Sequence, residues 1–378
     1  MAGIYIHIPF CRSRCIYCGF YSTTHSELRR RYVDALCKEY ALRKSYLDER
    51  VRTIYIGGGT PSQLDADDLR QLFGVLPTEA EEVTIECNPD DLTDDYAELL
   101  AQLPVNRVSM GAQTFSDERL RFLRRRHTAS QIAVAVERLR RVGIGNISVD
   151  LMYGFPGETL ADWHADIEQA LALGVEHLSA YGLMYEEGTP LYQLLQTGCV
   201  AEVDEELSRQ MYYDLKDRLE AAGYEQYEIS NFERTPEEGG ARSEERGASF
   251  RSVHNSGYWN QTPYLGLGAA AHSFDGRSRQ WNPDDLVRYM EAVERGEPVF
   301  EREVLDEETA YNELIMTRLR TSDGLPLELL TAEHRTYCLR LAEPFLADGL
   351  LVKEKDHLRL SRRGLYVSDM VMSELMKV

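Results

Sequence analysis

The sequence is poor in basic residues and has no long hydrophobic run. Its 378 residues include 42 lysines and arginines but 63 aspartates and glutamates, a formal net charge of −21. Because this charge repels phosphate groups, we expect no nucleic-acid partner. No run of about 18 apolar residues is present, so we expect no membrane-spanning helix and at most peripheral membrane contact.

Cysteine is also scarce, with seven residues, and the first residues show no signal-peptide pattern. We therefore expect a cytoplasmic protein with reduced thiols, in which clustered cysteines bind metals rather than form disulfides. Four cysteines are scattered and are expected to be packed in the interior: Cys37, Cys87, Cys199 and Cys338. The other three, Cys11, Cys15 and Cys18, lie together in "HIPFCRSRCIYCGF" and form the first candidate metal site.

The spacing C-x3-C-x2-C provides three thiolate ligands, which can bind a zinc ion or three irons of a cubane cluster. A structural zinc ion needs four protein ligands, and His7 or His25 could supply the fourth. A zinc finger, however, usually has two separated ligand pairs, and no second pair is present. The spacing therefore favours a 4Fe–4S cluster in which one iron has no protein ligand.

Short β-branched runs alternate with amphipathic helical stretches, such as 27–44 and 159–173, through the first half of the chain. The predicted strands are 3–8, 51–56, 82–86, 105–110, 146–152 and 176–181. This alternation predicts a parallel sheet with helices outside it. Six such units are too few for a closed eight-unit barrel, so we predict an α/β fold with an incomplete (β/α)6 barrel.

Unusual residues follow the predicted strands at their carboxyl ends. They are Pro9, Cys11, Gly57 to Gly59, Glu86, Gln113, Asp150, Tyr181 and Gly182. The carboxyl ends of barrel strands face one common mouth, where active sites are built. Polar residues can simply mark strand ends, but the convergence of six ends on a cysteine cluster favours a site.

The segment "IGGGTPS" (56–62) follows the second predicted strand directly. Three consecutive glycines let the backbone approach a ligand closely, although such a run can also be only a tight turn. The segment is neither a G-x-G-x-x-G motif nor a Walker loop, and no lysine follows it. A nucleoside triphosphate is therefore not indicated.

The pattern changes after Tyr227, and we divide the chain into four parts. The barrel is assigned to 1–232, a flexible charged loop to 233–252, a connecting region to 253–305, and a C-terminal module to 306–378. Helical patterns, a hairpin pattern and a final helix predict a winged-helix-like α+β module. Its 13 acidic and 10 basic residues argue against DNA binding and favour contact with the barrel or with a protein partner.

Four separated segments resemble motifs of one enzyme superfamily. The cysteine motif and "GGGTPS" are similar to segments of the radical S-adenosylmethionine (radical SAM) superfamily. More narrowly, "YIHIPFC", "GGGTPS", "MGAQTF" and "VDLMYGFPGET" resemble the branch that contains oxygen-independent coproporphyrinogen III oxidase and the heme chaperones of the HemW group. The similarity extends over nearly the whole chain, including the C-terminal module.

The resemblance implies specific roles for residues of this chain. Cys11, Cys15 and Cys18 would bind a 4Fe–4S cluster, and the remaining iron would bind the amino and carboxylate groups of S-adenosylmethionine (SAM). The residues implied around SAM are Tyr5, Gly58, Gly59, Thr60 and Glu86. Gln113, Arg125 and Asp150 match positions where the oxidase holds a second SAM. The alternative interpretation is that these three residues are ordinary polar side chains lining the barrel. One-electron reduction of the cluster would cleave SAM to methionine and a 5′-deoxyadenosyl radical.

Two features distinguish the chaperones from the oxidase within this branch. The oxidase has a further cysteine two residues after the third and a longer leader; here Phe20 takes the place of that cysteine. "HNSGYW" (254–259) fits the H-N-x-x-Y-W pattern of the chaperones, so His254 would be an axial heme ligand beside Tyr258 and Trp259. His272 is a possible second ligand.

The resemblance therefore implies a heme chaperone that delivers heme to hemoproteins such as respiratory enzymes and lacks coproporphyrinogen oxidase activity. Homodimerisation is plausible by analogy with the family. The alternative is a coproporphyrinogen III oxidase that decarboxylates propionates with a 5′-deoxyadenosyl radical. A radical enzyme acting on RNA is a weaker alternative, since the chain is acidic and has no RNA-binding signature.

Overall fold

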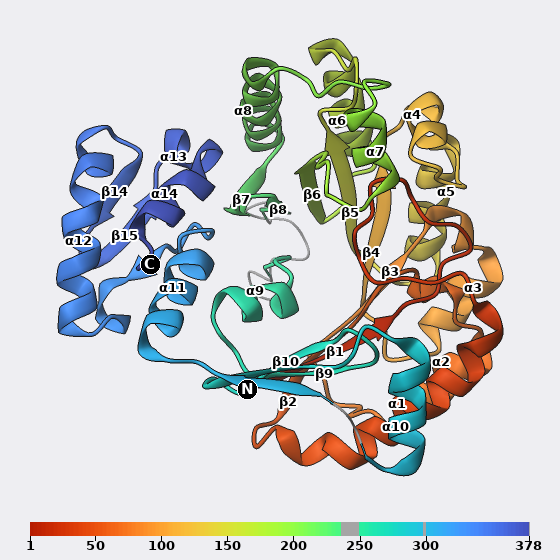
Figure 1. Cartoon of the computed structure of the whole chain (residues 1–378). Helices are drawn as coiled ribbons and strands as arrows, with labels where there is room; N and C mark the ends of the chain where they lie inside the picture. The colour runs from red at the N-terminus through yellow and green to blue at the C-terminus, as the bar shows by residue number, and fades with distance from the viewer. Residues whose placement is uncertain (236–248, 298–299, 378) are drawn as a thin grey trace.

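The computed structural model describes residues 1–235, 249–297 and 300–377, and an open, curved sheet of twelve strands forms its centre (Figure 1). Six parallel strands, each beside its neighbour in sequence, make up the middle of this sheet. They are β1 (Ala2–Ile8), β2 (Val51–Gly58), β3 (Glu82–Cys87), β4 (Arg107–Gln113), β5 (Asn146–Tyr153) and β6 (His177–Gly182). All six predicted strands are thereby confirmed, and β4 extends to Gln113.

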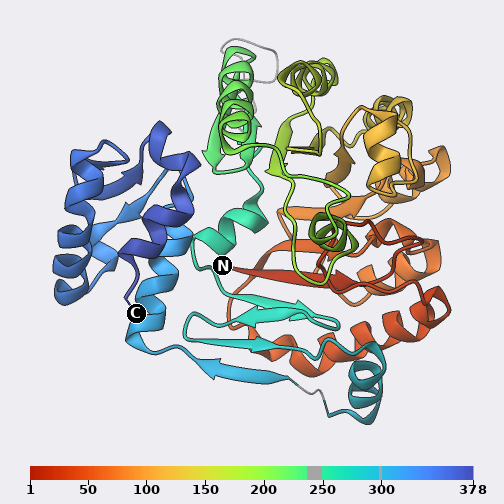
Figure 2. The same ribbon diagram turned by 45° about the horizontal axis from the view of Figure 1, so that its top comes forward.

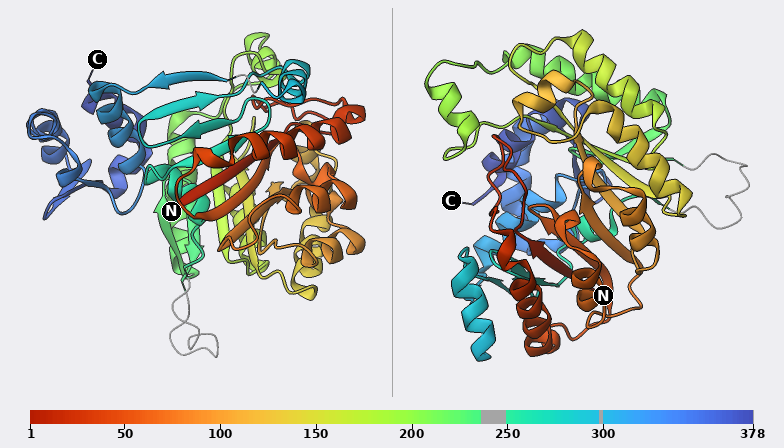
Figure 3. Two further views of the ribbon diagram at one scale, coloured as in Figure 1. Left: turned by 90° about the horizontal axis from the view of Figure 1, so that it is seen from below. Right: turned by 90° about the vertical axis from the view of Figure 1, so that its right-hand side faces the viewer.

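Six further strands, which the sequence did not indicate, extend the sheet at both edges. Beyond β6 lie β8 (Asn231–Arg234) and β7 (Tyr224–Glu228). Beyond β1 lie β9 (Tyr264–Leu267), β10 (His272–Phe274), β11 (Ser278–Trp281) and β12 (Glu301–Val304). Figure 3 shows these strands beside β1. The sheet is thus not confined to 1–232, and 253–305 is more than a connection. In the described residues β7 and β12 do not pair, so the barrel is incomplete, as predicted.

Helices cover the outer face of the parallel strands (Figures 1 and 2). They are α1 (Arg29–Arg43), α2 (Ala66–Phe73), α3 (Asp94–Ala101), α5 (Ala129–Arg141), α6 (Leu160–Ala172), α8 (Glu205–Ala221) and α10 (Leu286–Arg295). Two short helices, α4 (Asp117–Phe122) and α7 (Pro190–Gln196), instead pack with Ile16 of the loop after β1. In α5, a capping box between Thr128 and Gln131 starts the helix, and Ile132, Val136 and Leu139 are buried on one side. None of the helices in the described ranges is both long and apolar enough to cross a bilayer.

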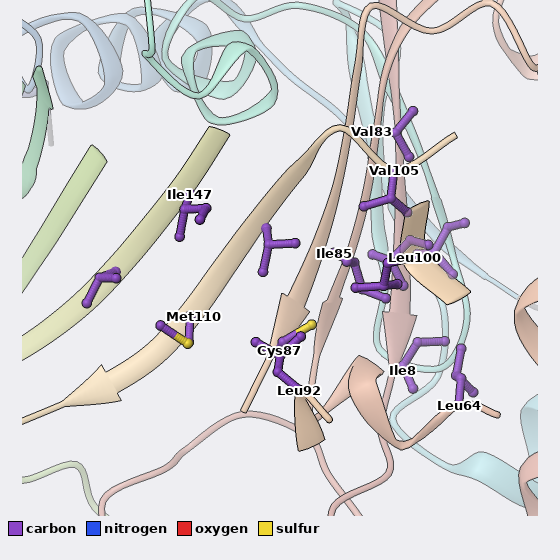
Figure 4. Close-up of a cluster of buried hydrophobic side chains, with 14 of the residues drawn as sticks. Ile8, Leu64, Val83, Ile85, Cys87, Leu92, Leu100, Val105, Met110 and Ile147 are labelled. Carbon is purple, nitrogen blue, oxygen red and sulfur yellow. The ribbon is translucent and has the colours of Figure 1, made fainter. Parts of the chain in front are cut away.

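Strand alternation separates the hydrophobic core from the polar interior of the barrel. On β1, Ile4, Ile6 and Ile8 are fully buried, whereas Tyr5 and His7 point to the other face of the sheet. Figure 4 shows part of the core, where Ile8, Ile85, Met110 and other side chains of neighbouring strands pack together with residues of the outer segments. The opposite face is left to polar and aromatic side chains, and the candidate site is built there.

The C-terminal part of the chain has its own hydrophobic cluster, which includes Tyr311, Ile315 and Cys338. Its elements are α11 (Glu307–Arg318), β13 (Leu325–Pro326), α12 (Ala332–Ala347), β14 (Leu351–Glu354), β15 (His357–Leu360), α13 (Arg362–Tyr366) and α14 (Ser368–Leu375). β13, β15 and β14 form an antiparallel sheet. This order of helices and hairpin is the predicted winged-helix-like arrangement. Of the predicted charged loop, 236–248 lie outside the described residues, and Glu233 and Arg234 belong to β8.

Candidate functional site

A cavity of about 620 Å³ opens at the carboxyl ends of the parallel strands. Its volume is in the range of ligand-binding pockets. Ten of the twelve predicted site residues line it: Cys11, Cys15, Cys18, Gly58, Gly59, Thr60, Glu86, Gln113, Arg125 and Asp150. Residues at or near the ends of β2, β3, β4 and β5 and in the loop after β1 therefore contribute to one site, as the parallel sheet predicted.

The cysteine loop is fixed on both sides by backbone hydrogen bonds. The amide of Cys11 donates to Thr23 O (2.8 Å), and the amide of Ile16 donates to Leu123 O (3.3 Å). Two polar side chains reach the sulfurs: Thr60 Oγ1 donates to Cys11 Sγ (3.3 Å), and Arg125 Nη1 donates to Cys15 Sγ (3.7 Å). Such donors stabilise thiolates, which are the form that binds iron.

The arrangement of the cysteines fits a cluster better than a single metal ion. In the described part of the chain, no three His, Cys, Asp or Glu side chains converge closely enough to hold one ion. A cubane does not require this convergence, because each cysteine binds a different iron. Both ring nitrogens of His7 are hydrogen-bonded, to Tyr5 OH (2.9 Å) and to Tyr21 O (2.9 Å), so neither is free to complete a zinc site in this conformation. The three cysteines with Thr60 and Arg125 thus suit a 4Fe–4S cluster.

The glycines at the end of β2 pack closely against the segment that leads into the cysteines. Gly58 has a φ of 112°, and a Cβ atom there would lie 2.6 Å from the His7 ring. A Cβ atom at Gly59 would lie 2.8 Å from the Pro9 carbonyl and 3.0 Å from Cys11 Sγ. Larger residues would clash with His7 and Pro9, so the glycine run is required by close approach of these segments and not only by a turn.

Glu86 is held at the inner wall of the cavity by two donors. Tyr55 OH donates to its Oε1 (2.8 Å) and the Gly58 amide donates to its Oε2 (3.0 Å). Burial raises the pKa of Glu86 to about 7, and the two hydrogen bonds oppose this rise. Near neutral pH the carboxyl group can therefore accept a hydrogen bond from a polar ligand or donate one to it.

Asp150, Gln113 and Arg125 lie on the β4 and β5 side of the same cavity. Burial raises the pKa of Asp150 to about 6, while hydrogen bonds from Ser179 and Ser109 lower it. Gln113 has a φ of 69°, an unusual conformation for a residue other than glycine. Arg125 donates to Asn88 Oδ1 (2.8 Å) and to the carbonyl of Gly111. These polar groups could hold a charged ligand beside the cysteines.

Tyr5 is one of two predicted site residues that do not line this cavity. Its hydroxyl lies 2.9 Å from His7 Nδ1, and its ring stacks on Tyr55 at 6.2 Å. Tyr55 lines the cavity instead, on the neighbouring strand at the same register. The alternation of "TIYIGG" placed Tyr55 on the inner face, so the sequence contained a signal for it.

Sequence reasoning also missed a set of polar residues that line the cavity. They are Arg107, His177 and Asn255, with neighbouring serines. His177 lies between Ser148 Oγ (2.7 Å) and Tyr227 OH (2.8 Å), and burial keeps its pKa well below the ordinary value. Arg107 and His177 lie at the beginnings of β4 and β6, where no site was expected.

His254 lies on α9 (Val253–Trp259) beside a second, smaller cavity of about 230 Å³. It is 3% exposed, and its ring stacks on Tyr55 at 5.1 Å. Nδ1 lies 2.8 Å from Thr53 Oγ1 and Nε2 lies 2.9 Å from Tyr258 OH. Burial lowers the pKa of His254 to about 3, so the imidazole is neutral. Neither nitrogen is free for iron in this conformation. His272 lines neither cavity and stacks on Trp281 (6.1 Å).

Comparison with known proteins relates both parts of the chain to described families. Residues 5–170 match the radical SAM superfamily model and residues 305–367 the HemN C-terminal domain model. Heme chaperone HemW of Bacillus subtilis (strain 168) is 35% identical, over 86% of this chain and 85% of the relative. HemW of Mycobacterium tuberculosis (strain ATCC 25618 / H37Rv) is 34% identical, over 99% of this chain and 94% of the relative. Coproporphyrinogen III oxidase (HemN) from Escherichia coli matches with a TM-score of 0.83 and 22% identity, over 100% and 90% of the two chains, which shows a shared fold.

The site and both family matches place the chain in the radical SAM superfamily, with a C-terminal domain of the HemN type. Membership of this superfamily implies a 4Fe–4S cluster and SAM. Within it, the chain belongs to the HemW family of heme chaperones, because relatives of that name are 31–35% identical over most of its length.

Proposed function

We propose that this chain binds heme and passes it to hemoproteins, respiratory enzymes among them, and that it holds a 4Fe–4S cluster and SAM in the barrel mouth. The observation that carries the proposal is the similarity to heme chaperones, which spans the barrel and the C-terminal module alike. We place this activity in the cytoplasm, with at most peripheral membrane contact and with homodimer formation as an additional property.

The residues of the mouth are proposed to hold the cluster and SAM. Cys11, Cys15 and Cys18 would bind three irons, while Thr60 and Arg125 donate toward the sulfurs. The glycine run, Glu86 and the polar wall would bind SAM, with Tyr5 supporting Tyr55 from behind. When bound and reduced, the cluster supplies an electron for cleaving SAM. The protein contributes orientation and exclusion of water.

His254 is the proposed iron ligand for heme. Its neutral imidazole is suited to axial ligation, and Thr53 can orient the ring. The Nε2 atom is bonded to Tyr258, so ligation requires that Tyr258 moves away. Phe20, which replaces the further cysteine of the oxidase, is exposed at the edge of the larger cavity and supports the chaperone over the oxidase.

A second candidate function is the decarboxylation of coproporphyrinogen III. The observation in its favour is the mouth itself, where cysteines, Glu86, Gln113, Arg125 and Asp150 share one cavity. This reaction predicts protoporphyrinogen and 5′-deoxyadenosine from a reduced, reconstituted sample. We expect neither to accumulate with coproporphyrinogen III as the substrate.

Heme transfer tests the proposed function directly. Heme-loaded protein is mixed under anaerobic conditions with an apo-hemoprotein whose holo form has a distinct absorption spectrum. We expect the heme spectrum of the acceptor to form faster than with an equal concentration of heme-loaded serum albumin. Transfer no faster than from albumin, together with formation of protoporphyrinogen in the product assay, would favour the oxidase.

A further inference from the structure

Arg107, the first residue of β4, is a buried cation in the lining of the larger cavity. It is 1% exposed. Within the described residues it forms no ion pair, since no carboxylate oxygen lies within 4.0 Å of its nitrogens. Two buried carboxylates of the same region have other donors: Glu82 accepts from the amides of Val253 and His254, and Asp150 accepts from Ser109. A buried charge without a close partner costs free energy, so Arg107 is suited to bind an anion.

The guanidinium group of Arg107 is anchored through one nitrogen only. Nη1 donates to Asn146 Oδ1 (2.7 Å) and to the carbonyl of Phe250 (2.9 Å). In residues 1–235, 249–297 and 300–377, neither Nε nor Nη2 has a hydrogen-bond acceptor. The hydrogens of Nε and Nη2 lie on one edge of the planar group, an arrangement that binds both oxygens of a carboxylate. Arg107 therefore offers a two-pronged donor to a ligand in the cavity.

The cavity extends along the inner face of β4, from the first residue of this strand to the last. Arg107, Ser109, Gly111 and Gln113 alternate along the strand, and all four line the cavity. At about 3.3 Å per residue, these positions span about 20 Å. The cysteines and Glu86 lie at the carboxyl ends of the strands, whereas Arg107 lies at their beginnings. Arg107 therefore belongs to a different part of the cavity from the proposed cluster and SAM.

The surroundings of Arg107 are polar but uncharged. Burial keeps the pKa of His177 well below its ordinary value, so the ring is neutral. Tyr227 OH bonds to this ring (2.8 Å) and accepts from the amide of Ser252 (3.2 Å), which places the beginning of α9 beside His177. Asn255 of α9 lines the cavity too, and its side-chain amide has no hydrogen-bond partner in the part of the chain that the structure describes. Hydroxyl groups of a ligand could bond there.

The charges that line the cavity favour a ligand with a single negative charge. No lysine is among the described lining residues, and the arginines other than Arg107 belong to the cysteine loop or to 124–126. Asp150 shares the cavity, and its carboxylate opposes a second negative charge on the ligand. A phosphate dianion is therefore a poor match for Arg107, whereas a monocarboxylate fits its charge and its shape.

We propose that the part of the larger cavity at the strand beginnings binds a small, hydroxylated monocarboxylic acid. Nε and Nη2 of Arg107 hold its carboxylate, and the Asn255 amide and the neighbouring serines meet its hydroxyl groups. The acid and SAM bind in the same cavity at the same time, the acid at the strand beginnings and SAM at the carboxyl ends. This inference goes beyond heme transfer and does not depend on it.

Calorimetric titration of the cluster-reconstituted, heme-free protein at constant chloride concentration tests the site. The probes are lactate, glycerate and gluconate, and the neutral amide of each acid is its control. We expect at least one acid to bind, and its amide to bind at least about tenfold more weakly because the amide lacks the charge. Binding of none of the three acids, or equal binding of acid and amide, would overturn the proposal.

Variants on the two sides of the guanidinium group test the role of Arg107. We expect Arg107→Gln to lose acid binding, and Arg107→Lys to bind about tenfold more weakly, since lysine keeps the charge but not the two-pronged donor. Asn146→Ala removes an acceptor on the anchored side and is the matched control, with an expected change of less than about threefold. Asn255→Ala, which leaves Arg107 intact, should weaken binding about fivefold through a lost hydrogen bond. Thermal unfolding of each variant shows whether a loss of binding reflects a loss of fold.

Titrations with SAM separate this site from the proposed SAM site. We expect saturating SAM to leave acid binding unchanged, and Arg107→Gln to bind SAM within about twofold of the wild type. Displacement of the acid by SAM, together with a loss of SAM affinity in Arg107→Gln, would assign Arg107 to the SAM carboxylate and overturn the separate site. Acid binding that Arg107→Gln retains would place the acid elsewhere and overturn it as well.

Discussion

At the scale of single residues, the cysteine spacing was the most informative feature of the sequence. It predicted a shared site for Cys11, Cys15 and Cys18, and the structure brings them to one cavity. The sequence places Tyr258 four residues after His254, but it could not show that Thr53 contacts the His254 ring, because that contact joins residues 201 positions apart. Partners of a buried ring depend on packing that no local pattern records.

Replacing one cysteine should remove the cluster. We expect Cys15→Ser to reconstitute with far less iron than the wild type and to lose the visible absorbance of the cluster, since a hydroxyl is a poor ligand for iron here. Cys199→Ser is the control, because Cys199 is exposed, contrary to the expectation that it is packed in the interior, and lies outside both cavities. Iron and sulfide analysis after anaerobic reconstitution checks this; full iron content in Cys15→Ser would contradict the assignment.

Glu86 should make the protein less stable as the pH rises. Its pKa is raised from 4.5 to about 7, so between these values the unfolded chain loses the proton first and stability falls with pH. Glu86→Gln removes this loss. At pH 8 we expect the free energy of unfolding of the variant to be about 2 kcal/mol higher than that of the wild type. SAM affinity should fall about tenfold. Denaturant unfolding of both proteins at pH 5 and pH 8 tests this direction of the pH dependence. A stability difference between variant and wild type that is equal at the two pH values would contradict it.

At the scale of secondary structure, the long, regular elements were predictable and the short ones were not. The six parallel strands are rich in β-branched and apolar residues, as in "TIYIGG". The missed strands are short, and several of them are polar: β11 is "SRQW" and β12 is "EREV". Such segments become strands through pairing at a sheet edge rather than through local propensity.

Strand β2 connects the two cavities, because Thr53 contacts His254 and Tyr55 contacts Glu86. The Tyr55 hydrogen bond lowers the pKa of Glu86. We therefore expect Tyr55→Phe to shift the pH dependence of SAM binding to higher pH. The phenylalanine ring keeps the stacking on Tyr5 and His254. SAM titrations from pH 6 to pH 9 measure this shift, with Tyr40→Phe on α1 as the control. An unchanged profile would show that Glu86 does not govern SAM binding.

At the scale of the whole molecule, the C-terminal module contacts the sheet and α9. Arg320 donates to the buried carboxylate of Glu228 (3.0 Å), and its guanidinium lies over the Trp259 ring (5.0 Å). The order of elements in the module was predictable from the sequence. These contacts were not, since they join residues far apart in the chain.

Breaking the Arg320 contact should loosen the module. We expect Arg320→Ala to lower the free energy of unfolding by about 3 kcal/mol, because Glu228 would stay buried without its partner. Arg335→Ala, which breaks an exposed pair with Asp356, should cost less than about 1 kcal/mol. Denaturant unfolding compares the two variants, and equal losses would mean that the buried pair does not hold the module.

Heme binding through His254 is the central claim, and an anaerobic heme titration of the cluster-reconstituted protein tests it most directly. Wild type and His254→Ala are titrated in parallel and then passed over a gel-filtration column. The account predicts a heme absorbance band that co-elutes with the wild type and is lost from His254→Ala. Heme that washes off both proteins would contradict the chaperone assignment, and heme retained equally by both would contradict the role of His254.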